Sequence, residues 1–184
     1  MNLANKLTIL RIIMVPFFML FLMLDHTNTA YITTALILFI AASLTDTLDG
    51  YIARHYNMIT NFGKFMDPLA DKMLTTSAFL ALMSFGRASA WAVMLILARE
   101  FIVAGIRQLA AGEGTVIAAS IWGKLKTVFQ MVAIIAAIIL LYPVCPEETS
   151  ILITDILVWL SAVVTVISGA DYVIKNIGIF RGAK

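Results

Sequence analysis

The chain consists largely of apolar stretches of about 18 to 26 residues, separated by short polar or turn-forming segments. An α-helix rises about 1.5 Å per residue and a hydrocarbon core is about 30 Å thick, so a helix of about 20 residues crosses it. Hydrophobic residues make up 61% of the chain and charged residues 13%, against about 45–50% and 25% in soluble domains. The sequence therefore predicts an all-α integral membrane protein, one membrane-embedded domain over residues 1–184. Its six expected transmembrane helices cover residues 7–24, 31–54, 65–85, 88–111, 117–142 and 151–174.

The basic residues predict the orientation of these helices. Six crossings place both termini on one side, and Lys and Arg are enriched in cytoplasmic connections. The side of the termini carries or borders twelve basic residues, whereas the opposite side has Arg87 alone. We therefore expect both termini to be cytoplasmic. The twelve are Lys6, Arg11, Arg54, Lys64, Lys72, Arg99, Arg107, Lys124, Lys126, Lys175, Arg181 and Lys184.

Several classes of function and processing are disfavoured by simple counts. The net charge of +2 is too small to indicate nucleic-acid binding. The single cysteine, Cys145, excludes a disulfide within the chain and a cysteine-based metal site. The first apolar stretch lacks a small-residue cleavage site, so we expect a retained helix rather than a signal peptide.

Four carboxylates lie within 26 residues between the apolar stretches. Asp46 and Asp49 share a helix face with Gly50, and Asp67 and Asp71 share a face of the next helix. Ionisable residues near a bilayer are costly and mark functional sites. If the two helices pack together, the carboxylates converge and repel one another unless hard divalent cations neutralise them. The spacing suits two cations about 3.5–4 Å apart, which can clamp a phosphate during in-line displacement.

Other interpretations of the carboxylates exist. Salt bridges to Arg54, Lys64 or Lys72 account for one or two of them, but less well for all four. A cation transporter would place its ion ligands near the middle of the membrane, whereas these acids lie toward the cytoplasmic end. A catalytically inactive scaffold has no need for the complete set.

The stretch reads Asp46-x-x-Asp-Gly-x-x-Ala-Arg54, then eight residues, then Gly63-x-x-x-Asp-x-x-x-Asp71. It resembles the motif of the CDP-alcohol phosphotransferase family at every defined position. The resemblance implies six transmembrane helices, a homodimer, and a cytoplasm-facing site with two Mg²⁺ or Mn²⁺ ions. It also implies a reaction in which an alcohol displaces CMP from a CDP-linked lipid.

The resemblance assigns roles by position. The metal ligands would be Asp46, Asp49, Asp67 and Asp71, and Asp71 would also act as the general base on the attacking hydroxyl. The CDP moiety would be bound by Asn5, Thr8, Gly50, Ala53, Arg54 and Thr60.

Basic residues further along the chain suit an anionic acceptor. Arg99 and Arg107 are eight residues apart, about 12 Å along a helix. Lys124 and Lys126 follow at the start of the next membrane helix. Arg and Lys at an interface suit a phosphate, to which Arg offers bidentate geometry. The alternative is an Arg99–Glu100 or Arg107–Glu113 ion pair, with the two lysines as ordinary cytoplasmic anchors.

These segments are similar to ones typical of one branch of the family, the phosphatidylglycerophosphate synthases. The similar patterns are Arg-Glu-Phe-x-x-x-Gly-x-Arg at 99–107 and Gly-Lys-x-Lys-Thr-x-x-Gln at 123–130, with a weaker match at 168–172. This resemblance implies CDP-diacylglycerol and sn-glycerol 3-phosphate as substrates in a bacterial cell membrane. The acceptor phosphate would lie near Arg99, Arg107 and Lys126, with Arg11 as a further candidate. Inositol phosphate, inositol and serine remain alternative acceptors, and Asp171 receives no role.

Overall fold

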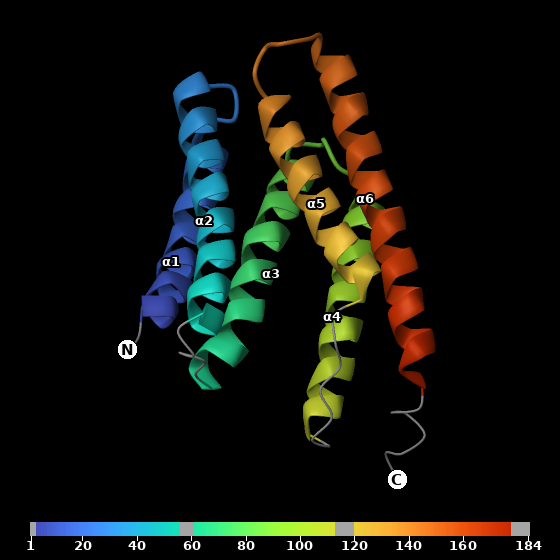
Figure 1. Cartoon of the computed structure of the whole chain (residues 1–184). Coiled ribbons are helices and arrows are strands. Elements are labelled where there is room, and N and C mark those ends of the chain that lie inside the picture. Colours follow the sequence, from blue (N-terminus) through green and yellow to red (C-terminus); the bar gives the residue numbers. More distant parts are fainter. Residues whose placement is uncertain (1–2, 56–60, 113–119, 178–184) are drawn as a thin grey trace.

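The computed structural model describes residues 3–55, 61–112 and 120–177, except for the side chains at 3–4, 47, 49–55, 61–62, 64–65 and 111–112. The described residues form six α-helices and no strand (Figure 1), which confirms the all-α prediction. The helices are α1 (Leu3–Leu24), α2 (Thr29–His55), α3 (Asn61–Ser84), α4 (Ala90–Gly112), α5 (Ile121–Ile139) and α6 (Glu147–Lys175).

Helix starts differ from the sequence prediction by a few residues, and α3 and α6 illustrate the reasons. We expected this helix to begin at residue 65, but α3 begins at Asn61 and contains Pro68 in its interior. The prediction started the helix where the long apolar stretch begins, whereas residues 61–64 before it also adopt helical geometry. Likewise α6 begins at Glu147 rather than at 151. Acidic residues in a first turn interact favourably with the helix dipole, so Glu147 and Glu148 suit the start of a helix.

Within the described residues, four helices contain a segment long and apolar enough to cross a membrane. The segments are Asn5–Leu24, Thr29–Asp46, Ile121–Ile139 and Glu147–Lys175. In their described parts, α3 and α4 carry the charged residues that the sequence had singled out, and these lower their hydropathy. Apolar length thus supports a membrane protein, while the charges of α3 and α4 demand partners inside the bundle.

The helices pack as two neighbouring groups (Figure 1). α1 packs against α2 and α3, and α6 packs against α4 and α5. Within the first group the rings of Phe18 and Phe39 meet with centroids 5.6 Å apart. Fully buried alanines, including Ala35 and Ala42, let the helices approach closely, as small residues do in membrane proteins. The start of α1 and the end of α6 lie at the same end of the bundle (Figure 1).

The turn between α3 and α4 terminates α3 and positions the buried side chain of Arg87. Gly86 has φ of 68°, a left-handed conformation that favours glycine. The backbone N–H of Arg87 donates to Leu82 O at 2.9 Å, as in a Schellman motif. The Arg87 side chain then reaches Ser150 Oγ and the carbonyl oxygen of Leu140. Arg87 therefore ties this turn to the α5–α6 connection. This structural role explains why a single basic residue lies on that side of the bundle, and no role in membrane orientation is needed.

We predict that Arg87→Met lowers the free energy of unfolding by about 1–3 kcal/mol, because a buried hydrogen-bond donor is removed. The measurement is the thermal midpoint in detergent. Glu147→Gln is the control, since Glu147 lies 3.9 Å from Arg87 with a side chain 80% exposed, and exposed pairs contribute little. Equal midpoints for wild type and Arg87→Met would contradict the proposed tie.

Candidate functional site

The predicted site residues with described side chains gather at one end of the bundle, the end where α1 begins and α6 ends (Figure 1). They come from five helices, α1 to α5, and most of them lie in the part of their helix nearest that end. The sequence analysis located this end but not the contacts within it. Those contacts form two groups, one rich in carboxylates and one rich in cations.

The carboxylate group lies between α1, α2 and α3. Arg11 Nη1 donates to Asp46 Oδ1 at 2.8 Å. Thr8 Oγ1 donates to Asp67 Oδ1 at 2.6 Å. Asp46 and Asp67 are close enough to interact electrostatically. The two halves of the aspartate motif therefore lie close together, and the start of α1 supplies donors to both carboxylates.

Arg11 is fully buried, although the sequence offered it as a candidate ligand for the acceptor phosphate. Its Nε donates to the carbonyl oxygen of Ala42 at 3.2 Å, one turn before Asp46. A buried guanidinium needs such partners because its desolvation is expensive. The structure thus places Arg11 in the carboxylate group, where it joins α1 to α2.

The donor chemistry of this group fits a hard divalent cation. Asp46, Asp67 and Asp71 offer carboxylate oxygens, which Mg²⁺ and Mn²⁺ prefer. Asp71 also interacts electrostatically with Asp46. Among the described residues no three potential ligands lie close enough to hold one ion. The side chain of Asp49, the fourth predicted ligand, lies outside the described residues.

Several predicted contacts with the CDP moiety also lie outside the description. The side chains of Gly50, Ala53 and Arg54 are not described, and Thr60 lies beyond the described ranges altogether. Asn5 is described and is buried near the start of α1. Together with Thr8, it places the predicted nucleotide contacts of α1 at the carboxylate end of the bundle.

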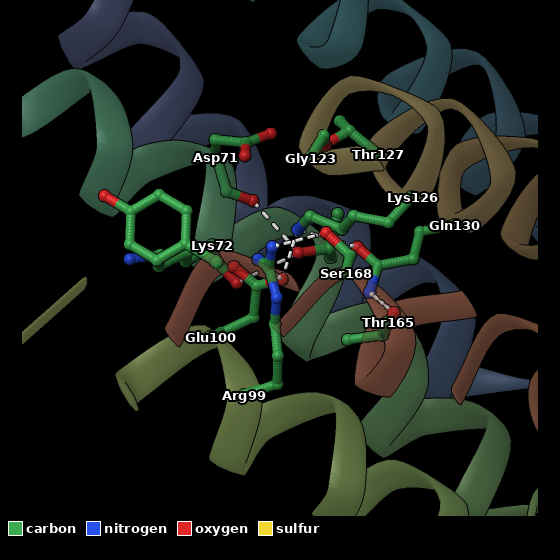
Figure 2. Close-up of polar contacts among 12 residues, drawn as sticks. Asp71, Lys72, Arg99, Glu100, Gly123, Lys126, Thr127, Gln130, Thr165 and Ser168 are labelled. Carbon is green, nitrogen blue, oxygen red and sulfur yellow. Dashed lines mark hydrogen bonds and ion pairs between the residues drawn. The ribbon is translucent and has the colours of Figure 1, made fainter. Parts of the chain in front are cut away.

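The cationic group lies between α4, α5 and α6 (Figure 2). Arg99 Nη1 lies 3.3 Å from Glu100 Oε1, and Lys126 Nζ donates to the same oxygen. Lys126 Nζ also lies 3.3 Å from Gln130 Oε1. Arg99 and Lys126 are only 8% and 7% exposed. The Arg99–Glu100 ion pair exists as the alternative reading anticipated, but Lys126 is buried and is not an ordinary surface anchor.

Two further cations surround this group. Arg107 Nε donates to the hydroxyl of Tyr172 at 3.4 Å, and its guanidinium carbon lies 5.5 Å from the centre of that ring. Lys72 interacts electrostatically with Glu100, Lys126 and Arg107. The group therefore holds four cations against Glu100, which leaves an excess of positive charge suited to an anion.

Asp71 connects the two groups. It interacts electrostatically with Asp46 on one side and with Lys126 and Glu100 on the other. Figure 2 shows Asp71 above the converging side chains of Arg99, Glu100 and Lys126. An anion held by the cations would thus lie beside a carboxylate that also borders the predicted metal ligands.

Several members of the cationic group were not predicted from the sequence. Lys72 was considered as a topology residue and as a salt-bridge partner of the aspartates, but not as a neighbour of Glu100, Lys126 and Arg107. Gln130 lies one helical turn after Lys126, a spacing that can pair them, and its Nε2 donates to Thr165 Oγ1 at 3.0 Å. Ser168 accepts from Arg99 Nη2 at 2.8 Å across 69 positions of sequence, for which no local pattern exists.

Known proteins are similar to this chain over nearly its full length, which includes both groups of side chains. Residues 1–167 match the family model described as CDP-alcohol phosphatidyltransferase. The chain is 42% identical to the CDP-diacylglycerol–glycerol-3-phosphate 3-phosphatidyltransferase of Bacillus subtilis (strain 168), with 95% of each protein covered. It is 37% identical to a protein of the same name from Rickettsia typhi, covering 93% of this chain and 94% of that protein. A Haemophilus influenzae protein of that name is 38% identical, covering 77% of this chain and 84% of that protein.

We predict that orthophosphate stabilises the protein through the cationic group. Phosphate at about ten times its Kd adds about 1.4 kcal/mol to the free energy of unfolding, measured as a rise in the thermal midpoint over chloride at equal ionic strength. Lys126→Met should reduce the response. Lys124→Met, which removes an exposed lysine two positions earlier, should retain it. Equal responses from the two variants would show that phosphate does not use this group.

Proposed function

The chain belongs to the CDP-alcohol phosphatidyltransferase family, and from that premise we propose that it transfers the phosphatidyl group of CDP-diacylglycerol to sn-glycerol 3-phosphate. The products are phosphatidylglycerophosphate and CMP. The names of the relatives describe the same transfer. The observation that carries the choice of acceptor is the position of Asp71, between carboxylates on one side and a buried cationic group on the other.

The carboxylate group suits the activated phosphate of the CDP-lipid. Asp46, Asp49, Asp67 and Asp71 would hold two Mg²⁺ or Mn²⁺ ions, which when bound neutralise the pyrophosphate and act as Lewis acids. Asn5, Thr8, Gly50, Ala53, Arg54 and Thr60 would surround the CDP moiety. The acyl chains of the lipid can stay in the bilayer while its head group enters the site.

The reaction needs a base beside the acceptor hydroxyl. Asp71 takes the hydroxyl proton while the oxygen attacks the phosphorus that carries the diacylglycerol, and the bond from that phosphorus to CMP breaks. CMP leaves with the electron pair of the broken bond. Asp71 suits this role because it borders both groups of side chains.

The cationic group suits the phosphate of the acceptor. Arg99, Arg107 and Lys126 offer N–H donors to a compact dianion, and Arg99 Nε is buried without a hydrogen-bond partner. A buried unpaired donor carries a desolvation cost that a bound phosphate oxygen would relieve. Neutral acceptors such as inositol or serine do not require this excess of positive charge.

We further propose that all six helices cross the membrane as one domain over residues 1–184, with the termini and the site facing the cytoplasm. The excess of basic residues at the site end supports this orientation. The structural role of Arg87 strengthens the asymmetry, because that residue no longer counts as a topology signal. By family resemblance the protein is a homodimer in a bacterial cell membrane.

We predict that the purified protein with Mg²⁺ or Mn²⁺ releases CMP from CDP-diacylglycerol only when glycerol 3-phosphate is supplied. Inositol, inositol phosphate and serine should give background rates, and a chelator should abolish turnover because the metals neutralise the pyrophosphate. The measurement is CMP release together with identification of the lipid product. Turnover with serine or inositol would replace the proposed acceptor.

We predict that Asp71→Asn lowers kcat by about 10²–10⁴-fold through loss of the general base, while CDP-lipid binding is retained. Single-turnover kinetics and lipid binding are measured on the same preparation. Asp155→Asn is the control, since Asp155 accepts from the backbone N–H of Ser89 at 2.8 Å, a role that an amide oxygen can keep. Near-normal turnover by Asp71→Asn would exclude the base role.

A further inference from the structure

The segment Ser168–Tyr172 of α6 lies against both arginines of the cationic group, and neither the reaction nor the family motif of four aspartates gives it a task. Ser168 is fully buried and accepts from Arg99 Nη2 at 2.8 Å. Four residues later, Tyr172 is 2% exposed and accepts from Arg107 Nε. Positions four apart lie on the same helix face, so one face of α6 contacts Arg99 and Arg107 together.

Gly169 determines how closely Arg99 approaches that face. A Cβ added at position 169 would lie 2.6 Å from Arg99 Cγ. Real Cβ atoms do not approach so closely, and Cγ lies near the root of a side chain that is almost fully buried. Alanine at 169 would therefore force the Arg99 side chain away from α6. Such a shift would separate Nη2 from Ser168.

The contacts leave one donor of Arg99 available. Nη1 faces Glu100 and Nη2 faces Ser168, whereas Nε is buried without a hydrogen-bond partner. Two contacts therefore fix the plane of the guanidinium and leave its Nε–H for another acceptor. Fixing a planar donor group in advance reduces the entropy lost when a ligand binds.

We propose that Ser168, Gly169 and Tyr172 are positioning residues that hold Arg99 and Arg107 in the geometry that binds the acceptor phosphate. The proposal rests on the proposed function, in which these arginines bind glycerol 3-phosphate. α6 then takes part in substrate selection without touching the substrate. The competing explanation is that Gly169 serves only the close packing of α4 and α6, as small residues commonly do in membrane bundles.

The test is steady-state kinetics of Gly169→Ala with each substrate varied in turn. The KM for glycerol 3-phosphate should rise by about tenfold, the effect of losing one charge-assisted hydrogen bond. The KM for CDP-diacylglycerol should stay within about twofold, because the carboxylate group is untouched. A change shared equally by the two KM values, or a fall in kcat alone, would overturn the proposal.

A double-mutant cycle separates positioning from packing. Arg99→Ala removes Cγ, the atom that the new methyl group would meet. In the Arg99→Ala background, Gly169→Ala should therefore change the KM for glycerol 3-phosphate no further. If the same increase appears in both backgrounds, Gly169 acts through packing and the proposal fails.

Ser168→Ala provides a milder variant should Gly169→Ala fold poorly. It should raise the same KM by about three- to tenfold, because Nη2 loses its partner. Ser161→Ala is the matched control: Ser161 is equally buried on α6, and its hydroxyl has no hydrogen-bond partner. Equal KM values for Ser168→Ala and Ser161→Ala would contradict the proposal.

Failure of this inference can be distinguished from failure of the proposed function. If wild type does not turn over glycerol 3-phosphate, or Arg99→Ala leaves its KM unchanged, the proposed acceptor site is wrong. If wild type is active and Arg99→Ala raises that KM while Gly169→Ala and Ser168→Ala do not, only the positioning role is wrong.

Discussion

Burial of ionised side chains in an apolar bundle is the constraint on which the rest of this structure depends. A charge removed from water must find an opposite charge or several hydrogen-bond partners inside the protein. Arg11 finds Asp46 and the carbonyl oxygen of Ala42, and Arg99 finds Glu100 and Ser168. Except for Glu100, which directly follows Arg99 on α4, these partners lie on other helices, so satisfying the charges also fixes how the helices pack. In this chain the functional polar groups are therefore part of the core.

The two charged groups divide the bundle into two parts. Carboxylates lie between α1, α2 and α3, whereas most of the cations lie between α4, α5 and α6. A transfer between a CDP-lipid and a phosphate-bearing alcohol has matching requirements, because one substrate is handled through metal ions and the other through direct cationic contacts. Asp71 on α3 interacts with both parts. The acceptor could therefore change by altering the second part while the carboxylates stay constant.

Much of this arrangement could be predicted from the sequence, but only where a local pattern exists. Apolar length predicted the helices, and helical spacing predicted that four aspartates converge if their helices pack together. In the structure Asp46 interacts electrostatically with Asp67 and Asp71, while the side chain of Asp49 lies outside the description. The start of α3 was misplaced because residues 61–64, before the long apolar stretch, also adopt helical geometry. Contacts between distant segments had no local signal, so the pairing of Arg11 with Asp46 and of Arg99 with Ser168 appeared only in the structure. Arg99, Arg107 and Lys126 lie near one another as a group, whereas the partners on other helices that orient them had no local signal in the sequence.

Glu100 is an acid inside a group proposed to bind an anion, and its presence follows from the same constraint on buried charge. Lys72, Arg107 and Lys126 lie within electrostatic range of one another, and like charges in a partly desolvated site repel. Without a carboxylate among them, their mutual repulsion would push these side chains apart before any substrate arrived. Glu100 contacts Arg99 and Lys126 through one oxygen, so it holds the cations together without neutralising them all. A phosphate then meets donors that are already assembled and still carry excess positive charge, which is the condition for preorganised binding.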